Sequence, residues 1–338
     1  MNYLEFYEMN EEPFSNAPIS RFFYNSAPHS KALVRLMYAI DSMKGFSVLI
    51  GEIGSGKTTL ARKLLDSLSE EEYEASLLVI IHSGIDAQWV LKRVAMQLGV
   101  EDPEDEKMAL LGQLYRRLVE IYESGRKAVV LIDEAQMLAS REVMEEFRGL
   151  LNLELPERKL LNIIFFGLPN LEQVLKLDPP LEQRIAVKYS LGSLDVESTE
   201  AYIKHRLRLA GAKRMLFTKE AISHIYSQSG GIPRLINTIC DNALFEGFIL
   251  KAKLIDFPLV KNVCKDLGLD QNQKPQSGGM RASDFATPYE IPRSKTGLSP
   301  RESNSLKGAA KTGPSDNTPN FEEIDGLLDG LLDEPQGN

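Results

Sequence analysis

The chain has 338 residues, of which 43% are hydrophobic and 26% are charged, and this ordinary globular composition allows a sizeable buried core. Acidic residues number 48 against 39 lysines and arginines, and the resulting net charge of −9 argues against a dedicated nucleic-acid coat protein. No apolar run reaches the roughly 18 residues of a membrane helix, and the first residues lack the basic and apolar regions of a secretory signal. We therefore expect a cytoplasmic protein without a transmembrane segment.

Short apolar strands alternate with helical patterns between residues 46 and 191. We expect strands at residues 46–50, 76–82, 127–132, 161–167 and 186–191. We expect helices after the first four strands, at about residues 57–69, 86–98, 140–153 and 169–176. Near-continuous apolar strands separated by helices are typical of a parallel sheet that is covered on both faces. The pattern thus predicts an α/β fold, and we assign residues 1–193 to this domain.

The most specific motif, GEIGSGKT at residues 51–58, follows the first predicted strand and opens the first predicted helix. Its glycines let successive backbone N–H groups turn inward and cradle phosphates at the N-terminus of the helix. Lys57 is expected to reach the β- and γ-phosphates of a nucleotide, and Thr58 to place its hydroxyl on Mg²⁺. The predicted nucleotide-binding residues of this P-loop, or Walker A motif, are Gly51, Glu52, Ile53, Gly54, Ser55, Gly56, Lys57, Thr58 and Thr59.

A second motif ends the third predicted strand with two carboxylates, Asp133 and Glu134. At the carboxyl end of a parallel strand both side chains are expected beside the phosphate-binding crevice. Asp133 can hold Mg²⁺ through water, and Glu134 can accept a proton from an attacking water or orient it. A solvated Asp-Glu pair at a strand end is the plain alternative, but the nearby P-loop favours a Walker B motif of a nucleotide hydrolase.

The strand patterns stop near residue 195, and three or four amphipathic helices follow. One of them ends at Gly230 and Gly231, and Pro233 begins the next. We assign residues 194–269 to a small all-α domain.

Residues beyond this helical domain change in composition. The segment 270–320 is rich in proline, serine and glycine and has no hydrophobic period, which predicts a disordered linker. In residues 321–335 six apolar residues recur at helical spacing among six acidic ones. This favours an acidic amphipathic helix that docks in the groove of a partner protein. An acidic tail that only aids solubility is the alternative.

These motifs resemble those of AAA+ ATPases, and more narrowly those of the general secretion pathway protein A (ExeA-type) family, which includes ATPases linked to pilus biogenesis. The resemblance covers about residues 1–268. It includes an aromatic leader at residues 7–15, residues 22–29, and the GEIGSGKTTL and LIDEAQ segments. It implies a P-loop NTPase (AAA+) fold with a helical lid, ATP and Mg²⁺ as cofactors, and a homo-oligomer, a ring or dimer, that assembles with ATP.

The resemblance also assigns roles to single residues. Tyr24 and His29 in the leader lie where the family contacts adenine. Arg184 matches the arginine finger that completes the site of a neighbouring subunit, and Arg234 matches the sensor-2 arginine of the lid. Leu168 stands where relatives carry a polar sensor-1 residue, which puts rapid hydrolysis in doubt because leucine makes no hydrogen bond.

We expect Mg²⁺-dependent ATP hydrolysis coupled to the assembly or remodelling of a secretion-system or pilus-type machine, with attachment to the inner membrane only through a partner. The predicted catalytic residues are Lys57, Glu134, Arg184 and Arg234, and the predicted metal ligands are Thr58 and Asp133. A DNA-associated regulator of the transposition or replication-initiation type is the first alternative. It is supported by the basic lid residues Lys204, His205, Arg206, Arg208, Lys213 and Arg214. A slow nucleotide-dependent oligomerisation switch, supported by Leu168, is the second.

Overall fold

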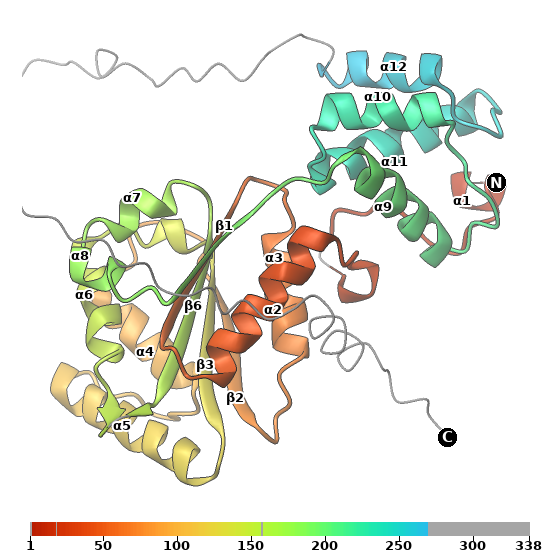
Figure 1. Cartoon of the computed structure of the whole chain (residues 1–338). Helices are drawn as coiled ribbons and strands as arrows, with labels where there is room; N and C mark the ends of the chain where they lie inside the picture. The colour runs from red at the N-terminus through yellow and green to blue at the C-terminus, as the bar shows by residue number, and fades with distance from the viewer. Residues whose placement is uncertain (1, 18, 157, 270–338) are drawn as a thin grey trace, which may run out of the picture. The chain divides into compact units, whose positions relative to one another are not determined.

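Five strands form a central sheet in which each neighbouring pair is parallel (Figure 1). The computed structural model describes residues 2–17, 19–156 and 158–269, so the predicted linker and acidic helix lie outside the described residues. Across the sheet the strands are β2 (Tyr73–Val79), β3 (Lys127–Asp133), β6 (Leu161–Gly167), β1 (Phe46–Gly51) and β7 (Val187–Leu191). Because β6 lies between β1 and β3, the carboxyl ends of these three strands lie side by side. The prediction of a parallel α/β sheet is confirmed.

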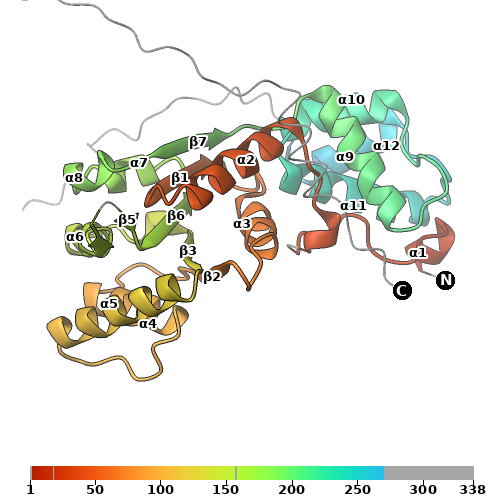
Figure 2. The ribbon, with the colours of Figure 1, turned by 60° about the horizontal axis from the view of Figure 1, so that its bottom comes forward.

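Helices cover both faces of this sheet, as Figures 1 and 2 show. One face is covered by α2 (Ala27–Asp41) and α3 (Lys57–Asp66), and the other by α4 (Ala87–Gln97), α5 (Lys107–Glu123) and α6 (Arg141–Leu150). Side chains alternate along the strands, so that Leu49 and Leu131 pack on the first face while Val48 and Val130 pack on the second. Every residue of β1 and β6 is buried, which explains their nearly continuous apolar sequences, interrupted only by Ser47 and Asn162.

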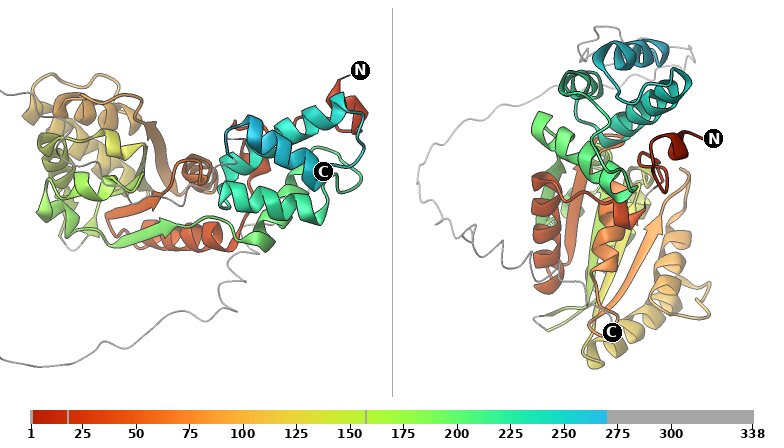
Figure 3. Two further views of the ribbon diagram at one scale, coloured as in Figure 1. Left: turned by 90° about the horizontal axis from the view of Figure 1, so that it is seen from above. Right: turned by 90° about the vertical axis from the view of Figure 1, so that its right-hand side faces the viewer.

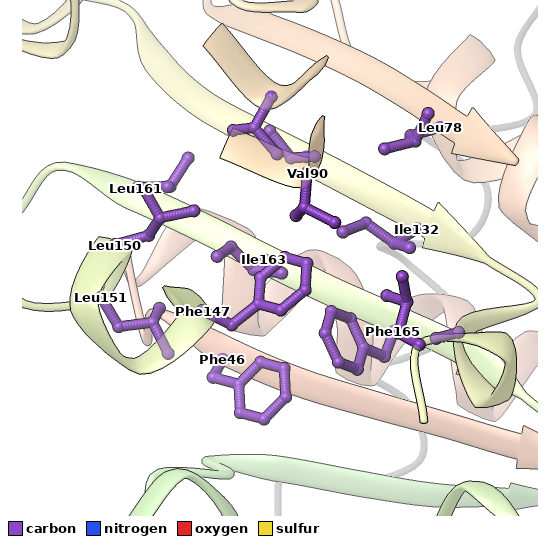
Figure 4. Close-up of a cluster of buried hydrophobic side chains, with 14 of the residues drawn as sticks. Phe46, Leu78, Val90, Ile132, Phe147, Leu150, Leu151, Leu161, Ile163 and Phe165 are labelled. Atoms are coloured by element: carbon purple, nitrogen blue, oxygen red, sulfur yellow. The ribbon is translucent and has the colours of Figure 1, made fainter. Parts of the chain in front are cut away.

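The second face is held together by aromatic and aliphatic side chains, drawn in Figure 4. Phe165 of β6 makes edge-to-face contacts with Phe46 of β1 and Phe147 of α6, with ring centroids 5.0 and 4.8 Å apart. This geometry places the positive edge of one ring against the negative face of another. The packing fixes β1, and with it the start of the P-loop, against β6 and α6.

Four helices follow the sheet and form the part that we call the lid. They are α9 (Val196–Leu209), α10 (Lys219–Ser229), α11 (Pro233–Ile249) and α12 (Phe257–Asp266). The side chains of Asp195, Thr218 and Asp256 each accept a backbone hydrogen bond at the start of a helix. Gly230, with φ of 58°, ends α10, and Pro233 begins α11, as predicted.

The leader packs differently from the prediction, which groups it with the α/β domain. Tyr7, Met9 and Phe14 lie in the hydrophobic core of the lid, and Figure 3 shows the N-terminal segment beside the lid helices. The Tyr7 hydroxyl also donates a 2.9 Å hydrogen bond to the carbonyl of Ala252. The aromatic residues of the leader have no period that reveals their partner, so the sequence alone does not distinguish the two locations.

Several elements were not predicted or have different bounds. The predicted strand 76–82 is shifted, because β2 begins at Tyr73 and ends at Val79, and Ile81 beyond it is exposed. Helices α2 and α5 were missed. So were the short elements α1 (Tyr3–Phe6), η1 (Ser20–Phe22), η2 (Ala135–Met137), β4 (Glu154–Leu155), β5 (Arg158–Lys159) and α8 (Pro179–Glu182). The helix predicted at residues 169–176 is present as the shorter α7 (Leu171–Leu175). None of the helices in the described part of the chain combines the length and apolarity needed to cross a bilayer.

Candidate nucleotide site

The P-loop joins the end of β1 to the start of α3. Gly54 and Gly56 have φ values of 79° and 100°, a left-handed conformation that strongly favours glycine. No side chain caps the N-terminus of α3, which opens into a cavity of about 390 Å³. Unpaired N–H groups and the helix dipole make such a terminus suited to an anion.

The side chain of Lys57 is buried and folds back over the loop. Its Nζ donates hydrogen bonds to the carbonyl oxygens of Gly51 and Glu52, at 2.9 and 3.0 Å. Burial lowers the pKa of Lys57, and the nearby carboxylates of Glu134 and Asp133 oppose this effect. A bound polyanion in the cavity would further favour the charged ammonium group.

Thr58 and Asp133 connect α3 to the end of β3. The Thr58 hydroxyl donates a 2.6 Å hydrogen bond to Asp133 Oδ2, and the Asp133 carboxyl is fully buried. Burial raises the pKa of Asp133, while this bond and one from the backbone N–H of Glu134 lower it. The two oxygen-bearing side chains suit Mg²⁺, which binds through one or two protein groups and completes its shell with phosphate and water.

Glu134 lines the cavity immediately after β3. Its backbone has φ of 56° and ψ of 34°, a left-handed conformation that is costly for a residue with a side chain and is often found at functional sites. One carboxylate oxygen of Glu134, Oε2, accepts a 2.5 Å hydrogen bond from Gln136 Nε2. Gln136 Oε1 in turn accepts one from the backbone N–H of Leu168, at 3.1 Å. Sequence reasoning assigned no role to Gln136, although it lies in the LIDEAQ segment.

His29 supports the P-loop backbone from α2. Its Nε2 lies 3.1 Å from the carbonyl oxygen of Ser55, and its Nδ1 lies 2.7 Å from Ser26 Oγ. Because a carbonyl only accepts, we assign the proton to Nε2, and Ser26 then donates to Nδ1. Burial lowers the pKa of His29, which favours this neutral form. A Cβ added to Gly56 would lie 2.9 Å from His29 Nε2, so the glycine also makes room for the ring.

The lid contacts the P-loop directly. The backbone N–H of Arg234 donates a 3.2 Å hydrogen bond to the carbonyl of Gly54, and a Cβ on Gly54 would lie 2.6 Å from the Cβ of Arg234. The exposed side chain of Arg234 lines the cavity. Tyr24 lines it from the leader, and its ring packs against Tyr202 and His205 of α9, at centroid distances of 5.9 and 5.5 Å.

Arg206 of α9 is a cavity residue that was interpreted from the sequence as part of a basic surface. It is only 5% exposed, and its guanidinium donates to the Tyr202 hydroxyl at 2.8 Å and to the Ser15 carbonyl at 2.9 Å. The guanidinium carbon also lies 4.8 Å from the centre of the Phe22 ring. The signal that was available is helical spacing, because Arg206 falls one turn after Tyr202 on the buried face of α9.

The structure brings most of the predicted site residues to this one cavity. Those that line it are Tyr24, His29, Ile53, Gly54, Gly56, Lys57, Thr58, Thr59, Glu134 and Arg234. The predicted site residues that are not among the described residues lining it are Gly51, Glu52, Ser55, Asp133 and Arg184. Arg184 is exposed, and its guanidinium donates to Asn152 Oδ1 at 2.6 Å and to the Arg148 carbonyl at 3.2 Å.

The chemistry of the cavity fits a nucleotide triphosphate with Mg²⁺. It combines an uncapped helix terminus, a buried lysine and a threonine–carboxylate pair. Ser55 of the loop has a buried hydroxyl oxygen for which the described residues provide no hydrogen-bond partner, but Ser55 is not among the described residues that line the cavity.

Comparison with known proteins agrees with this geometry. Residues 40–175 match the AAA domain family. Over 249 residues the chain is 38% identical to general secretion pathway protein A of Aeromonas hydrophila, in a match that covers 73% of this chain and 45% of that protein. The chain therefore spans less than half the length of that relative.

Two solved structures have a similar fold. Cdc6p from Pyrobaculum aerophilum matches with a TM-score of 0.56 and 17% identity over 75% of this chain and 70% of that chain. The ORC2 protein of Aeropyrum pernix, in its ADPNP–ADP complexes, matches with a TM-score of 0.55 and 17% identity, over 73% and 71%. At these identities the likeness concerns the fold alone.

Proposed function

We propose that this chain, which is similar to AAA domain proteins over residues 40–175 and to general secretion pathway protein A, binds ATP with Mg²⁺ and hydrolyses the γ-phosphate bond. The observation that carries this proposal is the convergence of three chain segments on one cavity. Lys57 and Thr58 reach it from α3, Glu134 from the end of β3, and Arg234 from the lid.

Each of these side chains has a role that its position supports. Lys57 would exchange its two carbonyl partners for phosphate oxygens, and Thr58 and Asp133 are the residues that would hold Mg²⁺. The bound ion supplies neutralisation of the charge on the phosphates. Glu134 orients the attacking water and accepts its proton. Arg234 contacts the phosphates from the lid, so that the position of the lid depends on the nucleotide.

Two substitutions test the proposal. We expect Lys57→Ala to abolish ATP binding, with Lys63→Ala on the same helix as the control that retains it. We expect Glu134→Gln to bind ATP normally and to lower kcat by about 10²- to 10⁴-fold, because it removes the proton acceptor but keeps the shape. Equilibrium binding of a fluorescent ATP analogue and a phosphate-release assay measure the two effects. Unchanged affinity in Lys57→Ala would rule out the P-loop assignment.

The similarity to general secretion pathway protein A suggests the process that hydrolysis serves. We infer that ATP-driven self-association assembles or remodels a component of a secretion-system or pilus-type machine at the cytoplasmic side of the membrane. Arg184 is exposed and is not among the described residues that line the cavity of its own chain. In this proposal it completes the site of a neighbouring copy. Residues 321–335 bind a protein partner in this scheme, and deleting residues 321–338 is expected to leave ATP turnover intact while that partner is lost.

The lid gives less support to a DNA-associated regulator. Of its basic residues, Arg206 is buried in the cavity wall, and Lys213 donates a 3.2 Å hydrogen bond to Glu8 of the leader. His205 is half-buried against Tyr24. Lys204, Arg208, Lys213 and Arg214 remain exposed, so four of the six basic residues are still available to DNA phosphates and two are not. Adding duplex DNA to the turnover assay separates the two functions, since stimulation of turnover would favour the regulator.

A further inference from the structure

The end of β6 lies between the P-loop strand β1 and the carboxylate-bearing strand β3. A polar side chain at this point would face both the phosphates and the attacking water. The chain has Leu168 there, and its side chain lines the cavity without any hydrogen-bonding group. What this position offers instead is its backbone N–H, which donates to Gln136 Oε1 at 3.1 Å.

That bond determines which way the Gln136 amide points. A backbone N–H only donates, so the atom facing Leu168 is the carbonyl oxygen of the amide, and the NH₂ group must face the other way. The NH₂ group lies 2.5 Å from Glu134 Oε2 and donates to it. One oxygen of the Glu134 carboxylate thus accepts a hydrogen bond from a neutral donor. Its second oxygen is left to accept a hydrogen bond from water.

The residues around Gln136 leave room for its two hydrogen bonds, to Glu134 and to the Leu168 N–H, and shield them from water. The residue is 7% exposed, so its amide is shielded from competing water. Gly167 leaves room for it, because a Cβ at that position would lie 3.0 Å from Gln136 Oε1 and 2.7 Å from the Leu171 side chain. The left-handed backbone of Glu134, with φ of 56°, turns the two side chains toward each other across two residues.

We propose that Gln136 is the positioning residue that orients Glu134 for water activation, anchored by the backbone of Leu168 at the end of β6. This inference rests on the proposed ATPase function. Gln136 acts through Glu134 rather than by touching the nucleotide. Its loss is therefore expected to affect kcat, while the groups that bind ATP stay in place.

The test replaces Gln136 by methionine, which keeps the length of the side chain but has no amide. We expect kcat to fall by about 10- to 100-fold, a part of the effect of a general base, with KM for ATP and the affinity for ADP unchanged within about twofold. Gln113→Met is the matched control. Gln113 also uses both ends of its amide, donating to the carbonyl of Asp102 and accepting from the N–H of Glu104, but it is not among the described residues that line the cavity.

A second variant keeps the experiment decisive if the methionine variant does not fold. Gln136→Glu retains the acceptor for the Leu168 N–H but loses the donor and places a second carboxylate beside Glu134, so it should reduce kcat at least as strongly. A kcat within twofold of that of the unsubstituted protein in the folded variant would overturn the inference. So would a parallel loss of ADP binding and melting temperature, which would indicate a merely structural role. Absence of ATP turnover in the unsubstituted protein would instead overturn the proposed function, and this inference with it.

Discussion

Two neighbouring glycines at the turn between α10 and α11 differ in what surrounds them. Gly230 and Gly231 have φ values of 58° and 73°, yet only Gly231 is crowded. A Cβ on Gly231 would lie 1.9 Å from the carbonyl oxygen of Leu194, in the segment that joins β7 to the lid, whereas a Cβ on Gly230 would meet nothing within 4 Å. The N–H of Leu194 also donates a 2.9 Å hydrogen bond to the Gly231 carbonyl.

These surroundings predict unequal costs for the same change. Gly230→Ala should lower the free energy of unfolding by about 1 to 2 kcal/mol, the cost of a left-handed alanine. Gly231→Ala should lower it by about 3 kcal/mol or more, because the backbone of Leu194 must also move. Urea denaturation of the two variants measures the difference. Equal losses would contradict the close approach of the two backbones.

His29 predicts a dependence of stability on pH. Because burial lowers its pKa below the ordinary value of 6.5, the unfolded chain binds a proton there that the folded chain resists. The free energy of unfolding should therefore fall as the pH drops below about 6.5. His29→Gln can still donate an amide hydrogen to the Ser55 carbonyl but does not titrate, so its stability should change less between about pH 7.5 and 5.5. Burial also lowers the pKa of His205, which contributes with the same sign in both proteins, so the difference between their slopes isolates His29.

At the scale of single residues, the sequence predicts site residues that belong to one contiguous motif and misses contacts between residues far apart in the chain. Lys57, Thr58, Asp133 and Glu134 are recognisable because phosphate and metal chemistry requires these residue types at short spacings. The partner of Gln136 is a backbone group 32 residues away, and it comes within reach only because β6 lies between β1 and β3. No local pattern carries that information.

At the scale of elements, the packing of the leader predicts which of its side chains stabilises the lid. Phe14 is 1% exposed in the lid core and packs edge-to-face on Phe217, with ring centroids 6.1 Å apart. Phe14→Ala should destabilise the lid by about 3 to 5 kcal/mol, because it leaves a cavity in a core that includes the leader. Phe245→Ala, on the exposed surface of α11, is the control and should cost about 0.5 kcal/mol or less. If the two variants unfold at the same urea concentration, the leader is not part of the lid core.

Strands were easier to locate than helices for a physical reason. Four of the five strands lie within one or two residues of their predicted bounds. In β1, β3 and β6 the apolar run is almost continuous, whereas β7 alternates polar and apolar residues. The missed α5 carries buried Leu110, Leu114 and Leu118 at spacings of four, and a capping side chain at Glu106, so its period was present in the sequence. The error at β2 has another origin. The apolar run continues through Ile81, but pairing with β3 ends near Ile80, where the chain leaves the sheet.

For the whole molecule, the cavity is enclosed by parts of the chain that are far apart in sequence. Leader residues such as Tyr24 pack on the lid, while His29, five residues later, holds the P-loop. The lid contacts the P-loop through the hydrogen bond from the backbone N–H of Arg234 to the carbonyl of Gly54. A ligand that contacts the P-loop and the lid together therefore biases their relative position, which is how nucleotide binding can be transmitted to a partner.

The prediction for the assembled protein concerns the role of Arg184 in ATP turnover. It is exposed in the segment between α8 and β7, where its guanidinium bonds a neutral amide and a carbonyl. If it completes a neighbouring site, ATP turnover per molecule should rise with protein concentration, and Arg184→Ala should lower kcat by about 10³-fold while leaving ADP binding unchanged. Arg141→Ala is the control, because Arg141 is an exposed arginine of α6 that pairs with Glu145 on its own helix. A turnover rate that does not depend on concentration, or an Arg184→Ala variant as active as Arg141→Ala, would show that each copy works alone.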